Sequence, residues 1–347
     1  MNSKIERGQF YTRTSPFQFK RFSTWLKALP NFQSLKYIEP FAGSNAIVKM
    51  ILEDFPEINL SRWTSFDIEP ESQELNLVPG LPLIQKDTLK NFPDGFDIAI
   101  TNPPYLAKNS ATRKGSDINF GIYQDLFEIS LERMLAKCNY VVAIIPESFI
   151  TRQLFLDRLE FVISLNTEMF EDTEFPVCLA VFSAMKSPNF EIWRGGDFLG
   201  TYNDLSVKVD EILLNVAPRI IKFNDPKGII GLTAIDSTKN PSIRFRLGSE
   251  IPESNIKVSS RAETRMSSSL FKTIEMADLV INQANIILDE YRKETHDVFL
   301  TSFKGLRSDG AYRRRLDWDT ASRILGTALV RIDPSLENIV TPGTRLF

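Results

Sequence analysis

The sequence predicts an α/β fold in two domains, with a mostly parallel sheet in the first domain. From about residue 35 to residue 146, short apolar runs typical of buried strands alternate with segments of helical periodicity. The run at residues 140–146 is almost continuously apolar, which is typical of a central parallel strand buried on both faces. The alternation ends near residue 190, so we predict a larger first domain of residues 1–189 and a smaller α+β domain of residues 190–347.

Composition limits the chemistry that this chain can carry out. The 347 residues include one histidine, His296, which excludes Ser-His-Asp catalysis and multi-histidine metal sites. The two cysteines, Cys138 and Cys178, lie in apolar runs, so we interpret them as reduced packing residues of a cytoplasmic protein without metal or disulfide. A polar amino terminus and the lack of any apolar run of about 18 residues argue against a signal peptide or membrane span. With a net charge of −3, contact with nucleic acid requires a local basic patch.

The chain begins with a glycine and a polar-aromatic cluster, Gly-Gln-Phe-Tyr-Thr, at residues 8–12. Ser15 and Pro16 follow, as an N-cap and a first-turn proline. Apolar residues spaced three or four apart over residues 16–29 then predict a helix that packs one face on a core.

A strand, a tight turn and a second helix come next. The turn has the sequence Glu-Pro-Phe-Ala-Gly-Ser-Asn, at residues 39–45, and follows a strand at residues 35–39. It has one glycine, Gly43, instead of the three of a dinucleotide-binding fingerprint, so we do not expect a pyrophosphate cradle. Glu39 at the strand end suits a ligand that carries a positive charge. An ordinary solvated turn explains these residues equally well until the neighbouring strand ends are considered.

Acidic residues end the next two strands as well. Asp67 ends a strand at residues 63–68 and lies 24 residues after Gly43, about the spacing at which a βαβ unit places a carboxylate on the hydroxyls of a ribose. Asp87 ends a third strand at residues 82–87. One carboxylate at a strand end is most often a solvated turn residue. Because the carboxyl ends of parallel strands meet at one edge of a sheet, several of them together predict a pocket.

The fourth strand, at residues 96–101, ends in Asn102-Pro103-Pro104-Tyr105. The two prolines fix their own φ angles and bias the residues before them toward extended geometry, so this corner is stiff. It presents the Asn102 side chain and the Tyr105 ring at the carboxyl end of the strand, where α/β proteins bind ligands. A plain proline-rich turn is the alternative for this motif taken alone.

The rest of the first domain is predicted to complete the sheet. Residues 106–120 are polar and without periodicity, as in a mobile loop over the sheet edge or an ordinary exposed loop, and a helix follows them. The runs at residues 161–165 and 177–185 predict an antiparallel hairpin that closes the sheet, with Phe170 or Phe175 at its tip.

Two segments carry the predictions for the second domain. Helical periodicity predicts a helix over residues 267–295. Residues 304–315 hold five basic side chains against the single Asp309. Such a run is most often a solvated surface, but it is also the best local candidate for contacts with DNA phosphates. The candidate phosphate contacts are Lys304, Arg307, Arg313, Arg314 and Arg315.

Taken together, these segments resemble the S-adenosylmethionine-dependent amino-methyltransferases. The resemblance rests on residues 8–12, residues 39–45, Phe-Asp-Ile-Glu-Pro at residues 66–70, the acidic end of the third strand, and Thr-Asn-Pro-Pro-Tyr at residues 101–105. More narrowly, the chain is similar to the adenine-N6 DNA methyltransferases of restriction–modification systems that have the cofactor motifs first and the target-recognition domain last. The resemblance covers residues 8–185. It implies a Rossmann-like sheet, S-adenosylmethionine as cofactor and a DNA-recognition domain at residues 190–347.

The resemblance also implies roles for residues along the sheet edge. Asp67 would bind the ribose hydroxyls, Ile68 would pack on the cofactor adenine, and Asp87 would accept a hydrogen bond from its exocyclic amine. Thr12 would lie near the methionine carboxylate. The implied cofactor-binding residues are Tyr11, Thr12, Glu39, Pro40, Ala42, Gly43, Asp67, Ile68, Asp87 and Asn102.

The implied catalytic residues are Asn102, Pro103 and Tyr105. The lone pair of an aromatic amine is delocalised into its ring, so the nitrogen is a poor nucleophile. If the side-chain oxygen of Asn102 and the backbone oxygen of Pro103 each accept an N–H bond, the lone pair is localised toward the methyl donor, and transfer then needs mainly positioning. A base inside a duplex must be flipped out to reach this corner. Tyr105 and Phe175 are the candidates that stack on its two faces.

The predicted reaction is therefore methyl transfer to the N6 atom of a flipped-out adenine in a specific double-stranded DNA site, which would protect that site from a restriction endonuclease. Asn102 favours adenine-N6 over cytosine-N4 by the same resemblance. The Asn-Pro-Pro-Tyr motif is shared with enzymes that methylate RNA or protein glutamine, so an RNA acceptor (guanine-N2 or adenine-N6) or a glutamine acceptor is an alternative. A non-catalytic DNA-specificity subunit is a second alternative. The expected partners are double-stranded DNA and a cognate endonuclease, with the chain a monomer or weak dimer.

Overall fold

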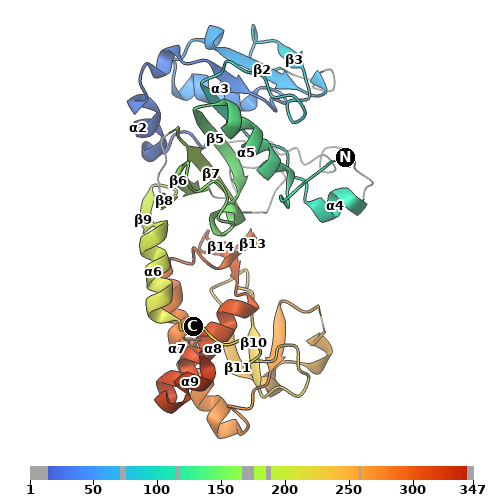
Figure 1. The fold of residues 1–347 in the computed structure, drawn as a ribbon, viewed down its shortest axis with the longest axis vertical. Coiled ribbons are helices and arrows are strands. Elements are labelled where there is room, and N and C mark those ends of the chain that lie inside the picture. The colour runs from blue at the N-terminus through green and yellow to red at the C-terminus, as the bar shows by residue number, and fades with distance from the viewer. Residues whose placement is uncertain are drawn as a thin grey trace, which may run out of the picture. The chain divides into compact units, whose positions relative to one another are not determined.

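The computed structural model describes residues 15–70, 76–113, 118–165, 176–184, 189–257 and 259–341. The chain divides into two compact units, Met1–Gly200 and Thr201–Phe347 (Figure 1). The sequence-based boundary lies after residue 189. The unit boundary follows Gly200 because the last two strands of the first sheet lie between these positions.

The first unit is built on one large sheet. Its strands are β1 (Tyr37–Glu39), β2 (Trp63–Asp67), β3 (Leu83–Gln85), β4 (Ile98–Thr101), β5 (Tyr140–Pro146), β6 (Leu159–Ser164), β7 (Val177–Phe182), β8 (Glu191–Arg194) and β9 (Asp197–Thr201). Over the described residues the strand order is β3-β2-β1-β4-β5-β7-β6-β8-β9. Strands β1 to β5 pair in parallel, and β7 lies antiparallel between β5 and β6. The predicted α/β class, with a mostly parallel sheet closed by an antiparallel hairpin, is confirmed.

The first unit has four helices among its described residues. They are α2 (Lys20–Ala28), α3 (Ala46–Asp54), α4 (Lys108–Arg113) and α5 (Leu126–Lys137), with 3-10 turns η1 (Phe32–Ser34), η2 (Leu60–Arg62) and η4 (Glu147–Thr151). Helix α3 contacts β4. Helix α2 starts later than the predicted residue 16 but buries Phe22 and Leu26, as the predicted apolar face requires. These side chains share a core with α3 and with alternate residues of the strands, such as Ile98 and Ile100 of β4. Helix α5 packs on β5 (Figure 1). The segment predicted as a loop at residues 106–120 contains α4.

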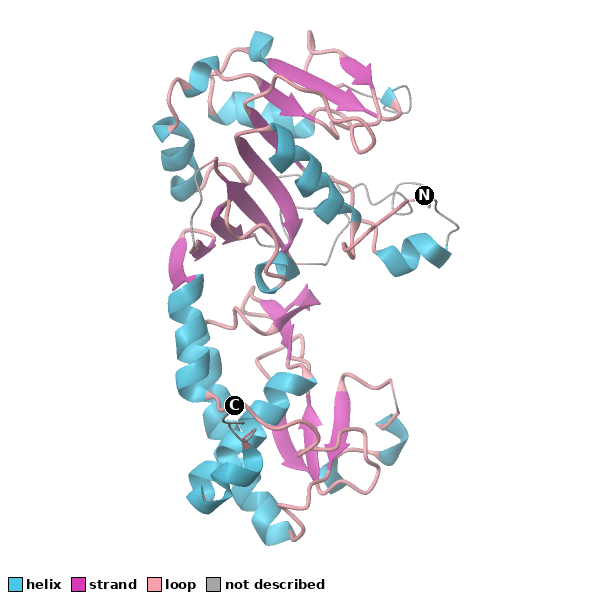
Figure 2. Cartoon of the chain, in the orientation of Figure 1, coloured by secondary structure: helices cyan, strands magenta, loops and turns pink. Residues whose placement is uncertain are grey.

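The second unit is α+β (Figure 2). Its helices are α6 (Tyr202–Ile212), α7 (Ile274–Thr295), α8 (Trp318–Ile332) and α9 (Glu337–Val340), with 3-10 turns η6 (Gly248–Glu250), η7 (Glu253–Asn255) and η8 (Pro334–Leu336). Its strands are β10 (Ile230–Thr233), β11 (Arg244–Leu247), β12 (Glu263–Met266), β13 (Thr301–Leu306) and β14 (Tyr312–Arg315). Strands β10 to β12 form an antiparallel sheet in the order β11-β10-β12, and β13 pairs with β14. Helix α7 packs on β11 and between α6 and α8.

Helix α7 begins later than the predicted residue 267 because the residues before it pair elsewhere. Ser267 and Lys222 exchange two backbone hydrogen bonds, and Ser268 forms a bridge with Phe271. Thr273 then caps the helix by accepting a hydrogen bond from the Met276 backbone N–H. Within the parts of the chain that the structure describes, no helix is long and apolar enough to cross a membrane.

Candidate active site

The strand order of the first unit puts the candidate ligand site at the carboxyl ends of β1 and β4. The order runs from β1 through β2 to β3 in one direction and from β4 to β5 in the other, so the topological switch point lies between β1 and β4. Glu39 is the last residue of β1, and Thr101 is the last of β4. The Thr101 hydroxyl donates a hydrogen bond of 2.5 Å to Glu39 Oε1, so the two strand ends are joined directly.

Glu39 is a buried carboxyl with one oxygen left over. Its Oε1 atom accepts hydrogen bonds from Thr101 and from the Phe41 backbone N–H, at 3.0 Å. Its Oε2 atom is buried and has no hydrogen-bond partner among the described residues. Burial raises the pKa of Glu39 to about 8, against the lowering effect of these hydrogen bonds. A cation placed beside Oε2 would satisfy this oxygen and favour the ionised carboxylate, which is the property expected of a site for an ammonium group.

The turn after β1 is held against the end of β2. Gly43 has a φ of +50°, which suits glycine, and its backbone N–H donates to Asp67 Oδ2 at 2.9 Å. Asp67 Oδ1 accepts from the Glu69 backbone N–H at 2.8 Å. The Ala42 backbone N–H donates to the Phe66 carbonyl at 2.9 Å. Each oxygen of a carboxylate accepts more than one hydrogen bond, so Asp67 can organise the turn and also bind a hydroxyl.

The residues after Asp67 and after β3 complete this edge. Ile68 follows the buried Asp67 but is 56% exposed, an apolar side chain suited to cover a flat ring. The Thr88 hydroxyl donates to the Pro40 carbonyl at 2.8 Å and so ties the segment after β3 to the β1 turn. Asp87 is engaged in its own turn, where Oδ1 accepts from the Lys90 backbone N–H at 3.1 Å and Oδ2 lies 3.3 Å from Lys90 Nζ.

The Asn-Pro-Pro-Tyr corner leaves β4 beside these residues. The Tyr105 hydroxyl lies 2.7 Å from Asn102 Oδ1 and 2.6 Å from the Ile144 carbonyl oxygen of β5. The Tyr105 ring stands edge-on to Phe127, with centroids 6.3 Å apart. This places the corner against both α5 and β5.

The chain after the corner is anchored by Asp125. Asp125 caps α5, and its Oδ1 atom accepts from the Leu106 backbone N–H at 3.0 Å. Burial raises the pKa of Asp125, and the backbone N–H donors oppose the rise. The stiff corner therefore has fixed supports on both sides.

The structure brings most of the predicted cofactor and catalytic residues to one sheet edge, namely Glu39, Pro40, Ala42, Gly43, Asp67, Ile68, Asn102, Pro103 and Tyr105. Tyr11, Thr12 and Phe175 lie outside the described residues. Thr101, Thr88 and Asp125 were not predicted from the sequence. Thr101 precedes the recognised motif directly, but its role depends on the pairing of β1 with β4, which has no local sequence signal.

The predicted basic segment forms the β13–β14 hairpin, and three of its five side chains have partners inside the second unit. Arg307 is 8% exposed and pairs with Asp236 at 3.1 Å and Asp309 at 2.9 Å. Arg314 is 4% exposed and donates to the Ser302 hydroxyl at 2.7 Å. Arg313 Nε donates to the Asp236 carbonyl at 2.7 Å. The sequence shows a run of positive charge, but it does not show which of these side chains are buried and paired within the second unit.

Asp236 is the centre of this buried network. It is fully buried and accepts two hydrogen bonds from Arg292, each of 2.9 Å. Burial alone would raise the pKa of Asp236, but the hydrogen bonds and charge of Arg292 outweigh it and hold the pKa below its usual range. In the described part of the chain, Lys304 and Arg315 of the same hairpin form no ion pair with a side chain.

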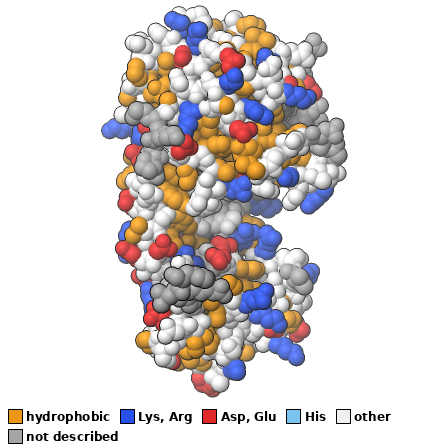
Figure 3. All heavy atoms as spheres, in the orientation of Figure 1, with side chains coloured by type: hydrophobic (Ala, Val, Ile, Leu, Met, Phe, Trp, Pro, Cys, Tyr) orange, Lys and Arg blue, Asp and Glu red, His pale blue; other side chains and the backbone are white. Residues whose placement is uncertain are grey.

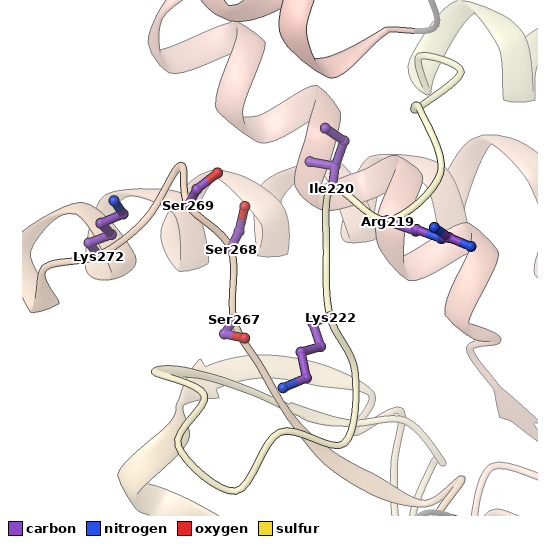
Figure 4. Close-up of a pocket in the computed structure, with 7 residues that line it drawn as sticks. All are labelled: Arg219, Ile220, Lys222, Ser267, Ser268, Ser269 and Lys272. Atoms are coloured by element: carbon purple, nitrogen blue, oxygen red, sulfur yellow. The ribbon is translucent and has the colours of Figure 1, made fainter.

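A second group of cations, not predicted from the sequence, surrounds a hollow of about 460 Å³ in the second unit (Figure 4). In Figure 4, Lys272 lies on the segment of residues 267–269, and Arg219 and Lys222 lie on the facing segment, where the Arg219 side chain points away from the serines. Lys222 Nζ is 3.1 Å from Asp225 Oδ2, while Arg219 and Lys272 form no ion pair within the described ranges. We call this hollow the cationic groove; its lining residues are Arg219, Ile220, Lys222, Ser267, Ser268, Ser269 and Lys272.

Three solved structures align with about half of the chain. A candidate class I S-adenosylmethionine-dependent methyltransferase from Listeria monocytogenes is 14% identical over 50% of this chain and 61% of its own, with a TM-score of 0.37. The type IIG restriction endonuclease BpuSI is 16% identical over 55% of this chain and 28% of its own, with a TM-score of 0.42. A type I restriction-modification methyltransferase subunit from Streptococcus thermophilus is 14% identical over 55% of this chain and 48% of its own, with a TM-score of 0.39. This chain thus spans less than two thirds of each relative.

A family model matches most of the first unit. No curated protein sequence matches the chain. The model of the Eco57I restriction-modification methylase matches residues 13–175, a range that includes β1 to β6 and the Asn-Pro-Pro-Tyr corner. The match agrees with the resemblance found in the sequence. The model of the Eco57I family thus matches residues 13–175, somewhat less than half of the 347 residues, all within the first unit.

Proposed function

We propose that the protein transfers a methyl group from S-adenosylmethionine to the N6 atom of an adenine flipped out of a specific double-stranded DNA site. The observation that carries this proposal is the position of Asn102 and Pro103, which leave β4 directly beside the buried Glu39 of β1. That juxtaposition puts amine acceptors and a cation site at one sheet edge.

The residues at this sheet edge suit S-adenosylmethionine. The unpaired, buried Oε2 atom of Glu39 matches the ammonium group of the methionine end. Asp67 would accept hydrogen bonds from ribose hydroxyls, and the exposed Ile68 would cover the cofactor adenine. Asp87, which is half-buried in its own turn, would accept from the adenine amine. When bound, S-adenosylmethionine supplies the methyl group; the protein supplies placement.

The acceptor corner fits a planar amine. The Asn102 side-chain oxygen and the Pro103 backbone oxygen each accept one N–H bond from the target amine, which draws its lone pair out of the ring plane. Holding this nitrogen in line with the methyl donor contributes on the order of 7–11 kcal/mol where the geometry is good. This chemistry needs no imidazole base, in agreement with a chain whose single histidine is His296, in the second unit. The Tyr105 ring, with Phe175 as its proposed counterpart, stacks on the flipped base.

The second unit is proposed to bind DNA. Its sequence has 21 Lys and Arg residues against 19 Asp and Glu, whereas the first unit has 20 against 25. On the face shown in Figure 3, Lys and Arg side chains recur over the second unit. The phosphate contacts are proposed for Lys304 and Arg315 and for Arg219, Lys222 and Lys272 of the cationic groove. The groove cations lie apart from one another instead of meeting at one point (Figure 4), which suits successive phosphates of a backbone.

The biological setting is proposed by the same reasoning. Methylation of adenine at one DNA site would protect that site from a cognate restriction endonuclease in the cytoplasm, with the chain acting as a monomer or weak dimer. RNA or protein glutamine is the second class of acceptor, because it also offers a planar nitrogen to the corner.

The test is transfer of labelled methyl groups from S-adenosylmethionine to double-stranded DNA, to RNA and to a glutamine-containing protein, followed by digestion of the DNA to nucleosides. We expect the label in N6-methyladenine. Label in RNA or protein with none in DNA would refute the proposed acceptor. Asn102→Ala removes one of the two amine acceptors and is expected to lower the transfer rate by at least about 100-fold, while cofactor binding measured by calorimetry stays close to that of the wild type.

A further inference from the structure

The hydroxyl of Tyr105 faces two oxygen atoms, although it has one proton to give. It lies 2.7 Å from Asn102 Oδ1 and 2.6 Å from the Ile144 carbonyl oxygen. Both distances are those of O–H···O hydrogen bonds. Burial holds the pKa of Tyr105 well above its usual range, so the phenol keeps this proton at neutral pH. The hydroxyl can therefore donate to only one of the two oxygens. The contact with the other residue is a hydrogen bond only if that residue presents a donor to the Tyr105 oxygen.

Ile144 cannot change its part in this arrangement. Its carbonyl is a backbone acceptor without a proton, and Ile144 is held in β5 opposite Leu179 of β7. Asn102 differs, because an amide side chain has an oxygen and an NH₂ group that exchange places on half a turn about the Cβ–Cγ bond. With Nδ2 facing Tyr105, a consistent chain results: the Asn102 NH₂ group donates to the Tyr105 oxygen, which donates to the Ile144 carbonyl.

We propose that Tyr105 is a positioning residue whose hydroxyl fixes the orientation of the Asn102 amide, so that Asn102 Oδ1 points away from Tyr105 and toward the target amine. The inference rests on the proposed function, in which Asn102 Oδ1 accepts from that amine. The opposite orientation would present the Asn102 NH₂ group to the N–H groups of the target. Both groups are donors, so no hydrogen bond could form between them. The hydroxyl is well placed for this task, because the Phe127 ring and the Asp125–Leu106 hydrogen bond fix the surrounding chain.

Tyr105→Phe tests this role, because it keeps the ring that stacks on a base and removes only the hydroxyl. We expect the single-turnover rate of methyl transfer to fall roughly 2- to 10-fold, the loss expected for one neutral hydrogen bond. Cofactor affinity and DNA affinity are expected to stay unchanged, because in the proposed site the Tyr105 hydroxyl contacts neither the cofactor nor the DNA. Tyr37→Phe is the matched control, because it removes a buried phenol whose hydroxyl donates to the Phe32 carbonyl at 2.6 Å. Its transfer rate per folded molecule is expected to equal that of the wild type.

The Asn102→Asp background distinguishes a positioning role of the hydroxyl from a purely structural one. A purely structural role would give the same effect of Tyr105→Phe on the transfer rate in both backgrounds. A carboxylate has an oxygen on both sides, so its orientation needs no selection. In the Asn102→Asp background, Tyr105→Phe is therefore expected to change the transfer rate less than 2-fold, so that the two substitutions are strongly coupled. An unchanged rate in Tyr105→Phe alone, or the same fold-loss in both backgrounds, overturns the proposal.

Failure of the proposed function is distinguishable from failure of this inference. If the wild-type protein methylates RNA or protein instead of DNA, the adenine acceptor is wrong. The same comparison of Tyr105→Phe with the wild type is then made on the acceptor that receives the label, because the orientation of the Asn102 amide matters for any planar amine.

Discussion

Replacing Glu39 by Gln is expected to remove a pH dependence from cofactor binding. With a pKa of about 8, about nine in ten Glu39 carboxyls are protonated at pH 7, and all but about one in a hundred at pH 6. In the proposed site the cofactor ammonium binds the ionised form, because it would pair with the otherwise unpartnered Oε2 atom. Affinity should therefore rise about 9-fold between pH 6 and pH 7 in the wild type, with about 0.9 proton released per molecule bound at pH 7.

Isothermal titration calorimetry at pH 7 in two buffers of different ionisation enthalpy, such as PIPES and imidazole, measures the released protons. The cofactor's own amine titrates equally with both proteins, so the difference between wild type and Glu39→Gln isolates Glu39. In the absence of cofactor, Glu39 keeps its proton in the folded state up to about pH 8, whereas the unfolded chain loses it near pH 4.5. The free energy of unfolding should therefore fall as the pH rises from about 5 to 8, by up to about 1.4 kcal/mol per pH unit. A wild type that releases no more protons than Glu39→Gln would refute this account of the site.

Two further predictions concern the second unit. A triple variant that replaces three groove cations by Gln should have a weaker salt dependence of DNA binding; the substitutions are Arg219→Gln, Lys222→Gln and Lys272→Gln. The slope of log affinity against log salt concentration should become shallower by up to about 2.7, at about 0.9 per phosphate contact. The control removes the same charge elsewhere, through Lys208→Gln, Lys293→Gln and Arg331→Gln on α6 to α8, and an equal change in both sets would show a general charge effect only. Asp236→Asn leaves Arg292 and Arg307 buried without a full partner and should cost about 3–5 kcal/mol in urea unfolding followed by circular dichroism. Asp309→Asn, which removes a half-exposed partner of Arg307, should cost at most about 1 kcal/mol, and similar losses for both variants would argue against a buried network.

The first unit was largely predictable because its signals are local in the sequence. The continuous apolar run of β5 identifies a central parallel strand, and each strand end is followed by a turn with recognisable residues. Asn102 and Tyr105 lie three residues apart on a corner stiffened by two prolines, so their proximity does not depend on the rest of the fold. The family match to residues 13–175 covers these same local signals.

The features that the sequence did not predict arise from pairing between distant segments. Thr101 meets Glu39 only because β4 lies beside β1, and these residues are 62 positions apart. The groove joins residues 219–222 to residues 267–272 through the backbone pairing of Lys222 with Ser267. The charge run at residues 304–315 was visible, but a count of charges does not indicate that Asp236 draws Arg307 into the core.

This distinction also explains why the candidate site combines a stiff motif with a titrating carboxyl. In the proposed function the Asn-Pro-Pro-Tyr corner would hold its acceptors in place before the substrate arrives, and local backbone restriction achieves this at little entropic cost. Glu39 has the opposite requirement, because its carboxylate is costly to bury until a cation reaches Oε2. Thr101 joins the two, since its hydroxyl bonds Glu39 while its backbone leads into Asn102. The arrival of the ammonium group at β1 should therefore strengthen a hydrogen bond at the base of the acceptor corner.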